Sequence, residues 1–304
     1  MPNLQVTHED AALTTSPTDA FTTRFRRVLA HVAAHPSDDL SVQRLSGIAA
    51  FSLHHFHRQF SALFGIGVYK YVSLVRLERA AWRLAFRDHR VIYIALDSGY
   101  ESHEAFSRAF KKAVGQTPSE FRQRPEWTAW QATHQPLSEL RSLHMQPDHH
   151  LGSVKTIHFD ETRVAALEHR GDPDQIGDSI RRFIEWRKQN RLPPKLSATF
   201  NIIYGSPETP PEDLRMDLCA ATTRPILPND FGVVEKLIPA GRCAVLRHHG
   251  SDDTLPATVH YLYATWLPAS GEDPRDFPLY FQRVSFFPDV PENEAVTDVF
   301  LPLR

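Results

Sequence analysis

The chain has 304 residues, of which 41% are hydrophobic and 23% are charged, and its formal net charge at pH 7 is -2. This length fits two domains, and the composition is that of an ordinary globular protein. We find no run of 18 apolar residues and no basic, apolar leader at the start, so we expect neither a membrane span nor a signal peptide, and a cytoplasmic location.

The small net charge conceals two oppositely charged parts. Residues 20–125 hold 16 Lys and Arg against 8 Asp and Glu, a net of +8, whereas the remainder holds 18 against 28, a net of -10. Such asymmetry favours a polyanion as the partner of the basic part. A solvated basic face without a partner would have the same composition.

The first third of the chain contains an internal repeat. We expect residues 1–19 to be a disordered tail and Phe21–His35 to form an amphipathic helix. A repeat with an offset of 50 follows, in which Phe56, Phe60, Phe64 and Gly65 recur as Phe106, Phe110, Val114 and Gly115. Aromatic residues at i, i+4 and i+8 predict a helix with one buried stripe, ended by a glycine.

The repeat has the pattern of two helix-turn-helix units. A short helix and a small-residue turn precede each stripe, at Leu45–Ser52 and at Ile94–Ser102. Between the copies, Val68–Ala85 is predicted as one connecting helix, and Thr117–Glu120 is a capping box that starts a last helix. Two such units about 34 Å apart would enter successive major grooves of DNA.

Side chains between the buried positions point outward and are the candidates for reading DNA. Arg can donate two hydrogen bonds to guanine, and Glu can accept one from cytosine. The expected base contacts are His54, His57, Arg58, His103, Glu104 and Arg108. The expected phosphate contacts are Ser52 and Ser102, at helix starts, with Lys111 and Lys112. For each of these the alternative is a merely solvated helix face.

The rest of the chain is organised by a second repeat. Residues 126–153 show weak periodicity and are expected to be a linker, partly helical, with no metal site at His149 and His150. Arg163–Gly171 then reappears as Arg242–Gly250, an offset of 79. Each copy is a strand followed by a helical stripe, a Pro-rich turn and an alternating strand. We therefore predict that 154–304 is an α+β domain of two β-α-β-β repeats with a cleft between them.

The basic third resembles the AraC/XylS DNA-binding domain. The resemblance is carried by Ile94 to Arg122, where the signature positions are occupied by Gly99, Phe106, Arg108, Phe110, Gly115, Pro118 and Arg122. It implies an all-α double helix-turn-helix domain over 20–125, with double-stranded DNA as partner and RNA polymerase as a further candidate. It also implies base readers at the positions of His54, His57, Arg58, His103, Glu104, Ala105 and Arg108.

Residues 154–304 resemble the GyrI-like effector module. Relatives bind amphipathic or cationic small molecules in the central cleft, often against a glutamate near the penultimate strand. Here that stretch, Pro278–Ser285, has no acid, so we expect a neutral or anionic effector. The candidate effector contacts are Trp186, Tyr204, Trp266, Tyr280, Phe281 and Glu168.

Together these features predict a ligand-responsive transcription regulator that is not an enzyme and needs no cofactor. The sequence shows no spacing typical of a catalytic triad, no HExxH and no phosphate-binding glycine loop. Two alternatives stay open. One is a hydrolase of reactive small molecules with Glu168 as base, and the other is a protein-binding module in the acidic half.

Overall fold

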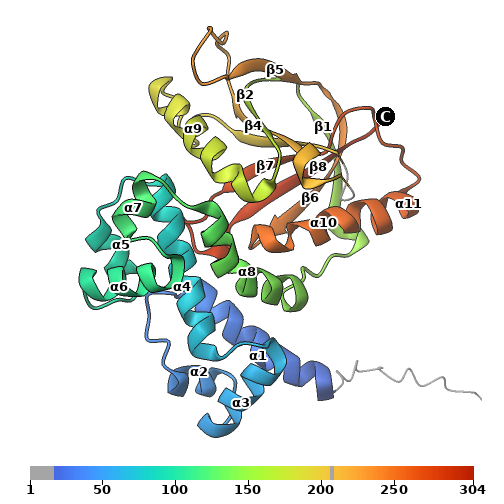
Figure 1. The fold of residues 1–304 in the computed structure, drawn as a ribbon. Helices are drawn as coiled ribbons and strands as arrows, with labels where there is room; N and C mark the ends of the chain where they lie inside the picture. The colour runs from blue at the N-terminus through green and yellow to red at the C-terminus, as the bar shows by residue number, and fades with distance from the viewer. Residues whose placement is uncertain (1–16, 206–208) are drawn as a thin grey trace, which may run out of the picture.

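A computed structural model describes residues 17–205 and 209–304. A helical domain is followed by a domain built on an eight-stranded sheet (Figure 1). Most of the tail expected at 1–19 lies outside the described residues, and the first helix, α1 (Pro17–Ala34), already begins within it.

The helical domain contains two helix-turn-helix units that share one long helix. The first unit is α2 (Val42–Ile48) and α3 (Leu53–Phe64), and the second is α5 (Val91–Asp97) and α6 (His103–Val114). Helix α4 (Val68–Phe86) joins them, and α7 (Pro118–Gln123) follows with the expected capping box at Thr117. The predicted aromatic stripes are buried, and α3 and α6 end at Gly65 and Gly115 in the left-handed conformation, with φ of 70° and 85°.

The turn of the second unit requires glycine at position 99. Gly99 has a φ of +73°, and a Cβ placed there would lie 2.6 Å from the guanidinium of Arg76. That guanidinium is held in place because it donates to the carbonyl oxygens of Pro36 and Asp38, at 2.9 and 3.0 Å. Any side chain at position 99 would therefore strain the backbone and displace a fixed neighbour.

The segment expected to be a partly helical linker belongs to the helical domain. Most of it is one helix, α8 (Trp127–His144), which contributes to both cores of the helical domain. Its first turns place Trp127 and Trp130 in the core of the second unit, and its later turns place Leu137 and Leu140 in the core of the first. The helical domain therefore extends about twenty residues beyond the boundary expected at 125.

The second domain has two equivalent halves. The strands of the first are β1 (Val154–Phe159), β2 (Thr162–Arg170), β3 (Thr199–Tyr204) and β4 (Arg215–Ala221), with helix α9 (Ile176–Gln189) after β2. The second half holds β5 (Val234–Ile238), β6 (Gly241–His249), β7 (Tyr280–Ser285) and β8 (Val296–Pro302). Its helical segment, after β6, is α10 (Leu255–Tyr261), a π-helical turn (Leu262–Trp266) and α11 (Leu267–Ser270). Each half thus carries one strand more than the predicted β-α-β-β unit, at its beginning.

All strand pairs are antiparallel, in the order β1-β6-β8-β7-β3-β4-β2-β5. Reading this order backwards exchanges the two halves, as a pseudo-twofold axis between β3 and β7 requires. The first strand of each half lies at an edge of the sheet, against the second strand of the other half. The halves therefore exchange their first strands.

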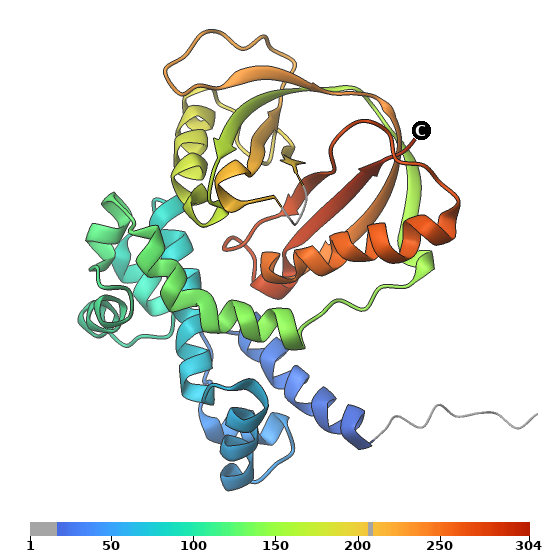
Figure 2. The same cartoon turned by 45° about the vertical axis from the view of Figure 1, so that its right-hand side comes forward.

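The sheet is curled, with its helices on the outside (Figure 2). The ring of Phe159 in edge strand β1 lies 6.0 Å from that of Phe200 in β3, although three strands separate β1 from β3. A flat sheet would hold two such strands about 19 Å apart, at about 4.8 Å per strand. We call the side that carries Phe159 the inner face, and the side that packs on α9 and α10 the outer face.

Among the described residues, no single helix is long and apolar enough to cross a membrane. Helices α3 and α4 pass that test only as a pair, which is bent by 63°.

Candidate DNA interface and effector site

Helix α3 exposes the residues expected to read DNA in the first unit. Because Phe56 and Phe60 face the core, His54, His57 and Arg58 lie exposed on the opposite side. Ser52 precedes the helix and its side chain makes no capping hydrogen bond. A shallow pocket of about 330 Å³ opens beside these residues and is lined by Val42, Leu53, His54, His57, Arg58 and Tyr69.

Helix α6 presents the equivalent surface with different chemistry. Glu104 and Arg108 are exposed and His103 is half-buried, and Lys111 and Lys112 are exposed in the last turn. The hydroxyl of Ser102 accepts from the backbone N–H of Ala105 at 3.1 Å, so this serine is a true N-cap. Hydrogen bonds from its own backbone N–H and from Ser102 lower the pKa of Glu104, which keeps this carboxylate an acceptor.

The six expected effector residues do not share one cavity. Trp186 packs on the outer face of the first half, and Trp266 and Phe281 on the outer face of the second. Tyr280 lies on the inner face in an aromatic core with Phe159, Phe200 and Phe300, and Tyr204 packs at its margin. The two tryptophans therefore do not form the walls of one cleft, because their helices both lie outside the curl.

The inner face carries a polar cluster on the neighbouring strands β3, β4, β2 and β5. The buried carboxylate of Asp217 accepts from Tyr204 at 2.8 Å and from Lys236 at 2.6 Å. Glu168 pairs with Arg215 at 2.9 Å, and the Arg215 guanidinium lies 4.7 Å from the centre of the Tyr204 ring. Hydrogen bonds from Arg170 and Arg215 lower the pKa of Glu168. Glu168 and Tyr204 are thus brought together, with two cations beside them.

The centre of the sheet holds Gln282 and Arg283 of β7, in the stretch that lacks an acid. Arg283 donates to the side-chain oxygens of Asn201 in β3 and Thr297 in β8, at 2.9 and 3.2 Å, and pairs with Asp252. This arginine therefore ties the seam between the two halves to the turn that follows β6.

Comparison with known proteins bears on both domains. A GyrI-like small molecule binding domain matches residues 153–304, and a helix-turn-helix domain matches residues 45–124. The probable transcriptional regulator YgiV of Escherichia coli strain K12 is 39% identical over 152 residues, which are 49% of this chain and 95% of that protein. The chain belongs to the GyrI-like family. With its helix-turn-helix domain of AraC type, it is a transcription regulator with a DNA-binding and a small-molecule-binding domain.

Two further similarities cover one domain each. The HTH-type transcriptional regulator YbfP of Bacillus subtilis strain 168 is 40% identical over 91 residues, 30% of this chain and 31% of that protein. The C-terminal domain of EcmrR is 17% identical and has a TM-score of 0.41, covering 50% of this chain and 96% of that one.

A buried charged junction connects the GyrI-like domain to the helical domain. Arg141 of α8 is 1% exposed and forms a two-point pair with Glu78 of α4, at 2.9 and 2.8 Å. On its other side it pairs with Asp253, at 3.0 Å, and with Glu292, both from turns of the GyrI-like domain. Burial and the neighbouring Glu78 raise the pKa of Glu292 to about 8, although Arg141 opposes the shift, whereas Arg141 lowers the pKa of Glu78 to about 2 against the effect of burial.

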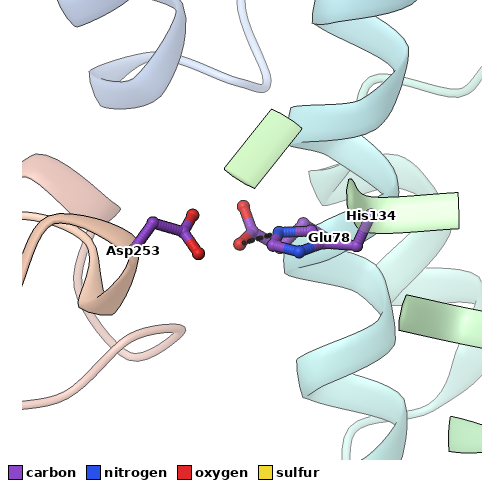
Figure 3. A group of neighbouring side chains, drawn as sticks. All are labelled: Glu78, His134 and Asp253. Atoms are coloured by element: carbon purple, nitrogen blue, oxygen red, sulfur yellow. Dashed lines mark hydrogen bonds and ion pairs between the residues drawn. The ribbon is translucent and has the colours of Figure 1, made fainter. Parts of the chain in front are cut away.

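Glu78, His134 and Asp253 at this junction have the residue types of a metal site (Figure 3). Their ligand atoms lie within 4.8 Å of one another. The guanidinium of Arg141, however, bonds to both carboxylates, and His134 bonds to Glu78 at 2.8 Å. The arginine already supplies the cation that the two acids need, so we interpret this group as an ion-pair network.

The junction residues were not among those singled out by the sequence. In the sequence, Glu78 and Arg141 resemble ordinary solvated charges. The helical pattern shows only that each lies near a buried stripe, not that it is itself buried. One signal was present: in α4, Glu78 falls between the buried positions Leu77 and Ala81, where a solvated acid is unexpected.

Proposed function

We propose that the chain binds a site of about 20 base pairs as a monomer, with α3 and α6 in successive major grooves. The observation that carries the proposal is the equivalence of α3 and α6, both exposed on their polar sides and both fixed to α4. Base contacts are assigned to His54, His57, Arg58, His103, Glu104 and Arg108, and phosphate contacts to Ser52, Ser102, Lys111 and Lys112.

Selection of bound duplexes from a random-sequence pool tests this proposal. We expect an asymmetric motif with two separate conserved blocks about one helical turn apart. Selection with Arg58→Ala should relax only one block, and selection with Arg108→Ala only the other. A strictly palindromic motif, bound only by dimers, would contradict the monomer.

We propose that the effector contacts the inner face near Tyr204, Tyr280 and Glu168, and that Trp186, Trp266 and Phe281 support this site from the outer face. Arg215 and Lys236 beside Tyr204, with Gln282 instead of an acid next to Tyr280 in the central strand β7, favour a neutral or anionic aromatic ligand over a quaternary amine. The chain would bind this ligand without converting it, because Arg170 and Arg215 engage Glu168 and make it a weak base at neutral pH.

Two fluorescent probes of opposite charge distinguish these ligand classes. We expect saturable binding of 8-anilinonaphthalene-1-sulfonate and weaker binding of rhodamine 6G. Arg215→Met should weaken the anionic probe, whereas Arg247→Met, which removes an exposed cation of the other half, should not. Tight binding of the cationic probe alone would reverse the assignment.

We propose that the regulator acts in the cytoplasm and contacts RNA polymerase when bound to its site. Transcription from a promoter that carries the selected motif, reconstituted with purified polymerase, tests this contact.

A further inference from the structure

Helix α8 lies beside α4 and, like α4, connects the two helix-turn-helix units. It is 18 residues long, about 27 Å at 1.5 Å per residue, and contributes buried residues to the cores of both helix-turn-helix units. Arg141 and His134 bind it to Glu78, near the middle of α4. The angle between the two DNA-reading units therefore depends on how α8 lies along α4.

Both halves of the GyrI-like domain hold this helix, one at each end. At its beginning, the indole N–H of Trp127 donates to Asp178 at 2.8 Å, and Gln175 donates to Thr128 at 3.1 Å. A Cβ placed on Gly177 would lie only 2.2 Å from the Trp127 ring. Toward the end of α8, Ser138 and Arg141 donate to Asp253, at 2.7 and 3.0 Å.

The two holding segments are equivalent turns of the duplicated unit. Gln175 belongs to the turn Pro173–Gln175 and Asp253 to the turn Asp252–Thr254, 79 residues later. Each turn is fixed by a histidine at the next-to-last position of the preceding strand. His169 bonds to the carbonyl of Asp172 and to Ser179, at 3.1 and 2.9 Å, and His248 bonds to the carbonyl of Ser251 and to Thr258, at 3.0 and 2.7 Å.

These histidine contacts agree in detail. In each case Nε2 donates to a carbonyl oxygen and Nδ1 bonds to a hydroxyl. Burial lowers the pKa of His248, which favours a neutral ring at that position. Each turn is thus a rigid extension of its half of the sheet.

We propose that α8 couples the two halves of the GyrI-like domain to the angle between the helix-turn-helix units, with Arg141 as the positioning residue. A shift between the halves at the β3–β7 seam would move the two turns relative to each other. Because α8 is held at both ends, it would tilt against α4 and carry the two units with it. The coupling extends the proposed effector response but does not depend on which ligand binds.

The distance between the two units in the full chain tests this coupling. Spin labels can be placed at Ala62→Cys on α3 and Tyr93→Cys on α5, both exposed, because Cys219 and Cys243 are buried. Without DNA or ligand, we expect one narrow distance distribution. Arg141→Met should shift or broaden it, Asp253→Asn should do so with less disturbance of packing, and Arg141→Lys should partly restore it. Arg247→Met is the control and should leave it unchanged.

A DNA measurement separates positioning from loss of fold. Arg141→Met should bind a duplex selected by the wild-type chain about tenfold more weakly. When the angle between the two helix-turn-helix units is no longer fixed, binding of one unit no longer holds the other at its groove, so the effective concentration of the second unit falls. It should bind that duplex truncated to the α6 half as the wild type does. An unchanged label distance in both Arg141→Met and Asp253→Asn, with native circular dichroism, would overturn the coupling. If the wild-type chain binds neither 8-anilinonaphthalene-1-sulfonate nor rhodamine 6G, while Arg141→Met still shifts the distance between the spin labels, only the effector proposal would be overturned.

Discussion

At the scale of single residues, the two reading helices differ in the chemistry that they present. Helix α3 exposes His54, His55 and His57, whereas α6 exposes an acid and, in its last turn, two lysines. Only the arginine recurs, as Arg58 and Arg108. We infer that the two grooves are read by different contacts, as an asymmetric site requires.

Arg108 and Lys111 should fail in different ways when they are replaced. Arg108→Ala removes a side chain that can donate two bonds to guanine, and should cost roughly 1–3 kcal/mol while relaxing specificity at one base position. Lys111→Ala removes a phosphate contact and should weaken all duplexes equally. Titrations against the selected duplex and its single-base variants measure both. A uniform loss in both variants would contradict the division between base and phosphate contacts.

The junction should also make stability depend on pH. The folded pKa of Glu292, about 8, lies above its ordinary value of 4.5, so the stability that its protonated form contributes is lost as pH rises from about 4.5 through 8. The decline should be at most about 1.4 kcal/mol per pH unit. Glu78 acts oppositely, because its lowered pKa gives stability that is lost as pH falls toward 2. Denaturant unfolding from pH 5 to 9 should show the alkaline decline in the wild type, and Glu292→Gln should flatten it.

At the scale of elements, the sequence predicted the helices and strands that have a regular hydrophobic period or occur in both copies of a repeat. The stripe of Phe56, Phe60 and Phe64 identified α3, and its copy identified α6. Helix α8 was predicted only as a partly helical linker, because Pro136 stands inside it and its buried positions change from one core to the other part-way along, which weakens any single stripe. The exchange of β1 and β5 was missed because β1 exposes most of its residues and lacks a strand's alternating pattern.

Helix α8 should decide whether the DNA-binding domain folds alone. Trp127, Trp130, Leu137 and Leu140 are buried in its cores, and each contributes roughly 1.5–3 kcal/mol. Their sum is comparable with the roughly 5–15 kcal/mol that keeps a domain folded. We expect the fragment 17–145 to unfold cooperatively and bind DNA, and the fragment 17–125 to be largely unfolded. Thermal circular dichroism on both fragments measures this difference, and a stable shorter fragment would show that α8 is dispensable.

At the scale of the whole molecule, charge is divided between the domains. Residues 20–125 carry a net of +8, whereas residues 154–304 hold 17 Lys and Arg against 22 Asp and Glu, a net of -5. An acidic domain therefore lies beside the DNA-reading surface without covering α3 and α6 (Figure 1). We infer that the acidic domain repels DNA elsewhere on the molecule, so that phosphate contacts form where the basic helical domain meets the duplex.

DNA affinity should fall steeply with salt, because the basic helical domain contacts several phosphates. About six neutralised phosphates imply a slope of log K against log salt of roughly -5. The slope measured with a non-selected duplex should be similar, since phosphate contacts do not depend on sequence. A slope near zero with the selected duplex would exclude DNA as the partner of the basic surface.

The exchange of first strands has a consequence for how this domain arose. In each half, the second strand is covered at its outer edge by the first strand of the other half. In a protein with a single repeat that edge would be open, and an open edge recruits another strand. Such a protein would have existed as a symmetric dimer in which each subunit completed the sheet of the other. Separate chains of 153–232 and 233–304 should accordingly associate when they are expressed together, which gel filtration can check. We infer that a gene fusion enclosed this former subunit interface within one polypeptide, and that the two turns that now hold a single helix descend from one surface, once present on each of two identical molecules.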